Sequence, residues 1–261
     1  MNDVLAPPAH HPDLPQVPLK PLGKVLAVTS GKGGVGKTFV SANLAAALAK
    51  RGHKVLVLDA DLGLANLDVV LNLYPKITLH DVFTGKAKLE DAILPAPGGF
   101  SVLLAGSGMV EYSRLTSEVR NEFLRVMNSL VPNYDVVILD TGAGISDVVL
   151  FAVSLASEVL MVATPEPTSL TDAYATIKVL VGQQQRQTIR VIINQATRSG
   201  SGVAITNQLQ QVLDRFVVVG LNQQAIMRRQ LMMQATPGCP AGVALGQIAR
   251  NLEESVIPRA A

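Results

Sequence analysis

Short runs of apolar residues recur along the chain and alternate with stretches that are predicted to be helical. The runs are continuous rather than interrupted by polar residues, which is typical of strands covered on both faces. They lie at residues 24–30, 54–59, 101–106, 135–141, 158–164, 190–195 and 216–221. Helical stretches between them include residues 40–52, 117–131, 169–182 and 203–216. This order predicts an α/β fold with a single doubly wound, mostly parallel sheet flanked by helices.

Composition fits one folded domain preceded by a tail. The chain has 261 residues, of which 48% are apolar and 16% charged, and this argues against disorder and against a protein that coats nucleic acid. The first 23 residues are rich in proline and lack a basic stretch followed by an apolar run, so they are not a secretory signal. We therefore predict a disordered tail at residues 1–23 and one domain at residues 24–261.

The single cysteine, Cys239, limits the chemistry that the chain can support. It cannot form an internal disulfide, and it cannot alone provide a four-cysteine zinc site or hold an iron–sulfur cluster. The sequence also lacks a run of about 18 apolar residues, the length that a spanning helix needs. We expect a cytoplasmic protein that is at most peripheral on the inner face of the cell membrane.

A glycine-rich turn follows the first predicted strand and fits the pattern G-x-x-x-x-G-K-[ST]. The turn consists of Gly31, Lys32, Gly33, Gly34, Val35, Gly36, Lys37 and Thr38. Glycines allow successive backbone N–H groups to face phosphate oxygens, and the next helix directs its positive end at them. Lys37 is then expected to reach the β- and γ-phosphates, and the Thr38 hydroxyl to bind Mg²⁺. A turn without a ligand is the alternative, which the strand–turn–helix context disfavours.

The lysine after the first glycine makes this turn GKGGVGKT, which resembles the deviant Walker A signature of the MinD/ParA group of ATPases. In that group the signature lysine reaches across a nucleotide-sandwich dimer to the partner's phosphates. The resemblance implies a P-loop NTPase fold of the MinD-like (SIMIBI) class, ATP and Mg²⁺ as cofactors, and a homodimer with ATP. It also gives Lys32 a catalytic role like that of an arginine finger. A solvent-facing loop lysine is the alternative.

Aspartates follow two of the predicted strands. Residues 59–68 read DADLGLANLD, which resembles the first switch of the same group. The resemblance places Asp59 near the water shell of Mg²⁺ and makes Asp61 the catalytic carboxylate that positions or deprotonates the attacking water. Asp140 ends a run of four apolar residues, a Walker B pattern, and is expected to hold Mg²⁺ through a water.

The residues that would contact the base are less well defined. By the same resemblance Asn194 would bond the adenine edge, although an asparagine in a loop turn is an alternative interpretation. The group usually carries Pro-x-Asp after the next strand. This chain reads GLNQQ at residues 220–224, so the acidic partner is missing.

The segment TPEPTSLTDAY at residues 164–174 resembles a string found in the flagellar-number regulators called FlhG or FleN. The start of a helix at Pro167 would explain the local residue types but not the length of the match. The resemblance covers residues 24 to about 258. It implies a slow ATPase switch that regulates flagellar number or placement through a flagellar GTPase or a transcription regulator.

Other functions stay open at this point. Residues 181–261 contain arginines, among them Arg228 and Arg229, but no lysine, which lends mild support to a DNA-partitioning ATPase of the ParA type. Whether the chain binds DNA is left open. A septum-positioning ATPase of the MinD type is another alternative, and a non-enzymatic nucleotide-binding scaffold is a third, which Lys32 and Asp61 argue against.

Membrane association is weakly supported by the sequence. The last predicted helix has an apolar stripe made of Leu245, Ile248, Leu252 and Val256. Its polar face lacks the excess of positive charge that anionic lipid favours. We therefore expect this helix to pack on the core. The proline-rich tail also lacks the Gln/Leu/Arg activator motif of many flagellar regulators.

Overall fold

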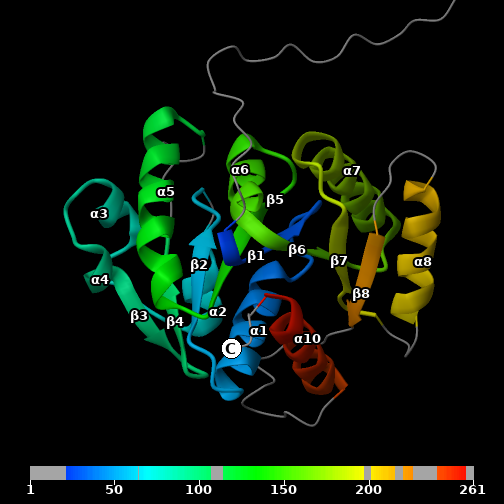
Figure 1. The fold of residues 1–261 in the computed structure, drawn as a ribbon, viewed down its shortest axis with the longest axis horizontal. Helices are drawn as coiled ribbons and strands as arrows, with labels where there is room; N and C mark the ends of the chain where they lie inside the picture. Colours follow the sequence, from blue (N-terminus) through cyan, green and yellow to red (C-terminus); the bar gives the residue numbers. More distant parts are fainter. Residues whose placement is uncertain are drawn as a thin grey trace, which may run out of the picture.

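The structure, a computed structural model, describes most of the chain and shows one eight-stranded sheet (Figure 1). The described residues are 22–63, 65–106, 114–196, 201–214, 220–225 and 240–256. Along the sheet the strand order is β3-β4-β2-β5-β1-β6-β7-β8. Neighbouring strands pair in parallel, except that β3 is antiparallel to β4. The strands are β1 (Leu22–Ser30), β2 (Val55–Ala60), β3 (Ile93–Ala96), β4 (Phe100–Leu103), β5 (Val136–Ala143), β6 (Ala156–Ala163), β7 (Thr188–Ile193) and β8 (Gly220–Ala225).

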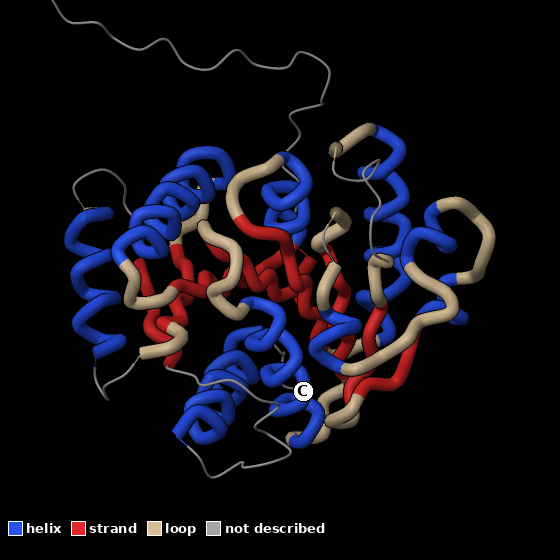
Figure 2. Tube along the Cα trace, turned by 180° about the vertical axis from the view of Figure 1, so that it is seen from behind, coloured by secondary structure: helices blue, strands red, loops and turns tan. Residues whose placement is uncertain are grey.

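Helices cover both faces of this sheet (Figure 2). One face is covered by α5 (Ser117–Leu130), α6 (Asp147–Leu155), α7 (Pro167–Gln184) and α8 (Ser201–Leu213), and the other by α1 (Lys37–Lys50) and α10 (Pro240–Val256). The shorter helices are α2 (Leu67–Leu71), α3 (Leu79–Phe83), α4 (Leu89–Ala92) and a 3-10 helix at Val131–Asn133. The predicted fold class, a doubly wound and mostly parallel sheet, is confirmed.

The residue types explain how these layers form. Every residue of β2 is buried, as a continuous apolar run predicts for a central parallel strand. Residues 40–48 of α1 are also all buried, and their many alanines let the helix lie close to the sheet. Helix α5 instead buries one face and begins at a cap, because the Thr116 hydroxyl accepts a hydrogen bond from the backbone N–H of Val119.

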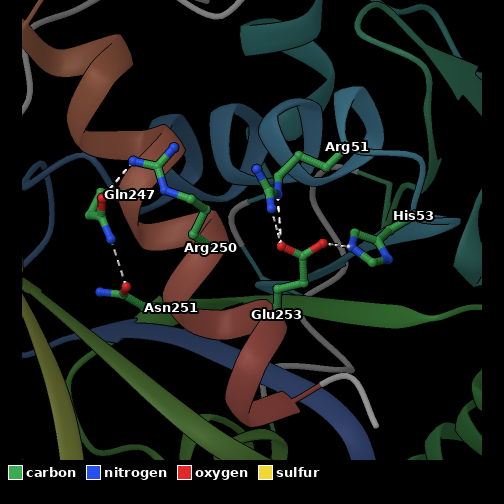
Figure 3. Close-up of polar contacts among 6 residues, drawn as sticks. All are labelled: Arg51, His53, Gln247, Arg250, Asn251 and Glu253. Atoms are coloured by element: carbon green, nitrogen blue, oxygen red, sulfur yellow. Dashed lines mark hydrogen bonds and ion pairs between the residues drawn. The ribbon is translucent and has the colours of Figure 1, made fainter. Parts of the chain in front are cut away.

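Helix α10 packs against α1. Three of its side chains are buried in the same apolar cluster as those of α1: Leu245, Ile248 and Leu252. Next to this contact, the Glu253 carboxylate accepts a hydrogen bond of 2.8 Å from Arg51 Nε and lies 2.5 Å from His53 Nε2 (Figure 3). The hydrogen bonds from Arg51 and His53 lower the pKa of Glu253. The predicted packing of this helix on the core is confirmed at those three positions.

Two edge strands differ from the sequence predictions. Strand β8 spans residues 220–225, so GLNQQ at residues 220–224 belongs to a strand and not to the loop predicted there. Residues 216–219 of the predicted strand lie outside the described ranges. Strand β3 was not predicted; it contains Pro95, which is acceptable at an edge, and it pairs with β4 through a Gly98-Gly99 turn in which both residues have positive φ.

Several predictions concern residues outside the described ranges. These include residues 1–21 of the predicted tail, Arg228, Arg229 and Cys239. Strand β1 begins at Leu22, and the division into a tail at residues 1–23 and a domain at 24–261 stays a prediction. In the part of the chain that the structure describes, no helix is long and apolar enough to cross a membrane.

Candidate nucleotide-binding site

The residues singled out from the sequence gather at the carboxyl ends of adjacent strands. The glycine-rich loop connects β1 to α1, while Asp59 lies in β2 and Asp140 in β5. Asp59 and Asp140 are register partners, and Val28 of β1 pairs with Asp140 on its other side. Asn194 follows β7 directly. This edge is where ligands bind in doubly wound sheets.

Lys37 is held at the centre of the loop. Its Nζ donates a hydrogen bond of 3.0 Å to Ser30 Oγ, and that hydroxyl in turn donates to the Lys32 carbonyl at 2.7 Å. Burial lowers the pKa of Lys37, while the carboxylates of Asp140 and Asp61 act in the opposite direction. A partly desolvated ammonium gains interaction energy from a polyanion such as a phosphate chain.

Asn194 packs against the second half of the loop. Its Nδ2 donates to the Val35 carbonyl at 2.7 Å, and its Oδ1 accepts from the backbone N–H of Gln195 at 2.9 Å. Gly36 has φ of 97°, and a Cβ placed there would lie 2.4 Å from Asn194 Nδ2. One amide N–H of Asn194 therefore supports the loop, and its contact with adenine stays a prediction.

The first half of the loop packs against α7. A Cβ placed on Gly31 would lie 2.2 Å from the backbone carbonyl atoms of Asp172, so no other residue fits there without a backbone shift. Sequence reasoning assigned this glycine to phosphate binding alone. Its close approach to a helix distant in sequence is a second reason for glycine at this position.

Asp140 has the environment of a cation ligand. The residue is buried, and burial raises its pKa to about 6 despite the hydrogen bonds from Thr38 and Ser41. Ser41 Oγ donates to Asp140 Oδ1 at 2.9 Å. Sequence reasoning missed Ser41, although its place three residues after Thr38 puts both hydroxyls on one side of α1.

The Asp59 carboxylate accepts hydrogen bonds from the backbone of the first switch. Its Oδ1 accepts from the backbone N–H of Asp61 at 3.1 Å, and its Oδ2 accepts from that of Leu67 at 3.3 Å. Burial and the charge of Asp140 raise its pKa well above the ordinary value. Two neighbouring buried carboxylates of this kind are stabilised by a divalent cation, so the residues fit Mg²⁺.

No group of three or more His, Cys, Asp or Glu side chains within the described ranges is arranged to hold a metal ion. Mg²⁺ does not need such a group, since it commonly binds through one or two carboxylates together with substrate phosphates. Thr38, Asp59 and Asp140 are the residues that would hold it here.

Asp61 of the first switch lies close to the end of β5. A Cβ placed on Gly142, just after Asp140 and Thr141 in β5, would lie 3.3 Å from Asp61 Oδ1. The carboxylate therefore faces the end of β5 while its backbone is held by Asp59. This position suits a group that acts on a water beside the γ-phosphate.

Lys32 is directed to α7. Its Nζ donates hydrogen bonds to Glu166 Oε2 at 3.1 Å and to Thr168 Oγ1 at 3.0 Å. Both partners belong to the TPEPTSLTDAY segment, which sequence reasoning used to choose a branch of the family but not to identify site residues.

Comparisons with known proteins agree with this architecture. A family model described as "AAA domain" matches residues 23–193. The chain is 40% identical over 246 residues to the antiactivator FleN of Pseudomonas aeruginosa, a match that covers 90% of this chain and 88% of FleN. The chain belongs to the MinD/ParA family of P-loop ATPases. It hydrolyses ATP, and its cofactors are ATP and Mg²⁺.

Two further relatives of this MinD/ParA ATPase are informative. The flagellum site-determining protein YlxH of Helicobacter pylori is 35% identical over 190 residues, which cover 72% of this chain and 64% of YlxH. Among solved structures, the septum site-determining protein MinD of Pyrococcus horikoshii, complexed with Mg-ADP, has a TM-score of 0.69 at 28% identity. That match covers 88% of this chain and 96% of MinD.

Proposed function

We propose that this ATPase is a nucleotide-dependent switch that regulates the number or placement of flagella through a partner protein. The similarity to FleN over nearly the whole chain is the observation that carries the flagellar assignment, and the similarity to YlxH supports it. The TPEPTSLTDAY segment agrees with the same branch. The description of FleN as an antiactivator favours a transcription regulator as the partner over a flagellar GTPase.

The hydrogen bonds that Asp59 accepts within the first switch support a switching role. Because Asp59 bonds the backbone of both Asp61 and Leu67, a change at the metal side of the site alters the segment that connects β2 to α2. Helix α2, which follows that segment, has an exposed apolar side chain at Val69, and another lies just after the helix at Tyr74; a partner could contact both. The nucleotide state and the protein surface are therefore coupled by hydrogen bonds of one carboxylate.

Hydrolysis follows from the same arrangement. Loop N–H groups and the Lys37 ammonium would hold the β- and γ-phosphates, and Thr38, Asp59 and Asp140 would hold Mg²⁺. When bound, Mg²⁺ neutralises charge that develops on the phosphate oxygens. Asp61 orients the attacking water and accepts its proton as the water oxygen bonds to the γ-phosphorus, while ADP leaves with the electrons of the broken P–O bond.

The proposed active form is a homodimer with ATP. In it Lys32 of each subunit contacts the phosphates of the other, and a second ammonium stabilises the transition state. Neither ParA-type DNA binding nor MinD-type septum positioning gains support from the described residues. The burial of Leu245, Ile248 and Leu252 against α1 supports packing of α10 on the core, and we propose a cytoplasmic protein that is at most peripheral on the inner face of the cell membrane.

Deletion and complementation in the source bacterium test this function. We expect deletion to change the number or position of flagella, the wild-type gene to restore it, and an Asp61→Ala allele to fail although the protein accumulates. A normal flagellar pattern together with misplaced septa or lost plasmids would instead support the MinD or ParA alternative. A pull-down with and without ATP then identifies the partner.

A further inference from the structure

The contact between Lys32 and α7 joins parts of the chain that are distant in sequence. Glu166 and Thr168 lie 134 and 136 residues after Lys32 and come from the first turn of one helix. One carboxylate and one hydroxyl bind the same ammonium. Two partners from one helix end restrict the direction of the lysine side chain far more than one partner does.

Helix capping does not explain the presence of a glutamate at position 166. It is the N-cap residue of this helix, yet its side chain makes no capping hydrogen bond. A carboxylate at that position is ordinarily stabilised by the free backbone N–H groups of the first turn. Here it accepts a hydrogen bond from Lys32 instead, and Pro167 occupies the first helical position.

The backbone on both sides of Lys32 is also fixed. Gly31 lies against the backbone carbonyl of Asp172, one turn further along α7. The Lys32 carbonyl accepts a hydrogen bond from Ser30 Oγ, the same hydroxyl that binds Lys37. The deviant loop and the start of α7 thus form one packed unit that determines where the Lys32 ammonium points.

We propose that Glu166 and Thr168 form a latch that holds Lys32 within its own subunit and competes with the phosphates of the second subunit for its ammonium. Both are positioning residues that act through Lys32. The inference rests on the proposed ATP-bound dimer. It predicts that Lys32 of each subunit must leave Glu166 and Thr168 before its ammonium can contact the phosphates bound to the other subunit.

The latch is weak enough to open. The Lys32 and Glu166 side chains are 40% and 63% exposed, and exposed ion pairs of this kind shift an equilibrium by about two- to fivefold. A triphosphate carries more negative charge than one carboxylate and lies in a drier environment once a dimer closes, so it outcompetes Glu166. The latch therefore raises the protein concentration needed for dimerisation without preventing it.

Amine labelling of the nucleotide-free protein tests the contact itself. Glu166→Gln and Thr168→Val should each increase the rate at which an N-hydroxysuccinimide acetate acetylates Lys32, by about two- to fivefold for Glu166→Gln, measured by peptide mass spectrometry. Thr168→Ser, which keeps the hydroxyl, should label at the wild-type rate. Glu122→Gln is the matched control, because Glu122 forms an exposed ion pair with Arg125 on α5. Unchanged labelling of Lys32 in Glu166→Gln and Thr168→Val would overturn the latch.

Association in a hydrolysis-deficient background tests the competition. With Asp61→Ala chains saturated with ATP and Mg²⁺, adding Glu166→Gln should lower the dimer Kd about two- to fivefold by sedimentation velocity, whereas adding Glu122→Gln should not. A weaker or unchanged dimer would overturn the proposal. If Asp61→Ala chains without a second substitution bind ATP and stay monomeric, the proposed dimer is wrong. That outcome differs from a failure of the latch alone, in which the dimer forms but Glu166→Gln does not strengthen it.

Discussion

Asp59 and Asp140 lie opposite each other on neighbouring parallel strands, and both are buried at the edge where the glycine-rich loop begins. Burial raises the pKa of each, and the charge of Asp140 contributes to the shift at Asp59. The pair therefore destabilises the protein when no cation is bound and provides the negative charge that attracts one. Stability and Mg²⁺ binding are thus linked through the same two side chains.

Asp140→Asn should stabilise the protein in the absence of nucleotide and metal. The folded-state pKa of Asp140 is about 6, against an ordinary value of 3.8, so the folded state holds its proton more tightly than the unfolded state. This contribution favours folding below pH 3.8 and becomes unfavourable as the pH rises through 6. At pH 7 we expect substitution to raise the free energy of unfolding by about 3 kcal/mol.

Urea unfolding in EDTA at pH 7 and at about pH 5 measures this effect. The gain should shrink at the lower pH, and it should be absent for the exposed control Asp91→Asn. Mg-ATP should stabilise wild type much more than Asp140→Asn. An Asp140→Asn protein that is less stable than wild type in EDTA at pH 7 would contradict the assignment.

Lys37→Ala should abolish nucleotide binding, because it removes the charge that neutralises the β- and γ-phosphates. Isothermal titration with ATP and Mg²⁺ measures the loss, with the exposed Lys50→Ala as the control. Affinity within about threefold of wild type, less than roughly 0.7 kcal/mol, would count against the phosphate-loop assignment.

Asp61→Ala should bind ATP without turning it over. The substitution leaves Lys37, Thr38 and Asp140 in place but removes the carboxylate that orients the water. We expect phosphate release to fall to background while light scattering at saturating ATP shows a dimer. Monomers with bound ATP would show that the nucleotide-sandwich arrangement is wrong for this protein.

Lys32→Ala should keep ATP binding but lose hydrolysis and ATP-dependent dimerisation, because no ammonium then offsets repulsion between the two phosphate chains. Mixing Lys32→Ala with Asp61→Ala chains gives heterodimers in which one site has its own Asp61 and the partner's Lys32. That mixture should regain part of the activity. Heterodimers without activity, or wild-type activity in Lys32→Ala alone, would make Lys32 an ordinary loop lysine.

The sequence predicted the parts of the site whose chemistry is local. The loop from Gly31 to Thr38 and the strand-end aspartates follow from motif spacing, and the parallel sheet brings them together at one edge. Contacts of Asn194 with Val35 and of Gly31 with Asp172 depend instead on how β7 and α7 pack on the loop. The spacing of residues within one segment does not predict such contacts between distant segments. The packing roles of Asn194 and Gly31 could therefore be seen only in the structure.

The strands at the edges of the sheet were also difficult to predict from the sequence. Central strands such as β2 were located because burial on both faces demands apolar residues throughout. Strands β3 and β8 lie at the two edges, and pairing on one side permits Pro95 in β3. Hydrophobic pattern is a weak guide there, and the loop predicted at residues 220–224 belongs instead to β8.

The packing of α10 on α1 has a consequence for synthesis. Helix α1 begins at Lys37 in the phosphate loop, yet α10 follows every other described element in the chain and therefore leaves the ribosome after them. Until α10 arrives, the alanine- and leucine-rich surface of α1 that it covers is exposed. A nascent chain therefore carries the whole phosphate-loop sequence before α10 can cover this surface of α1.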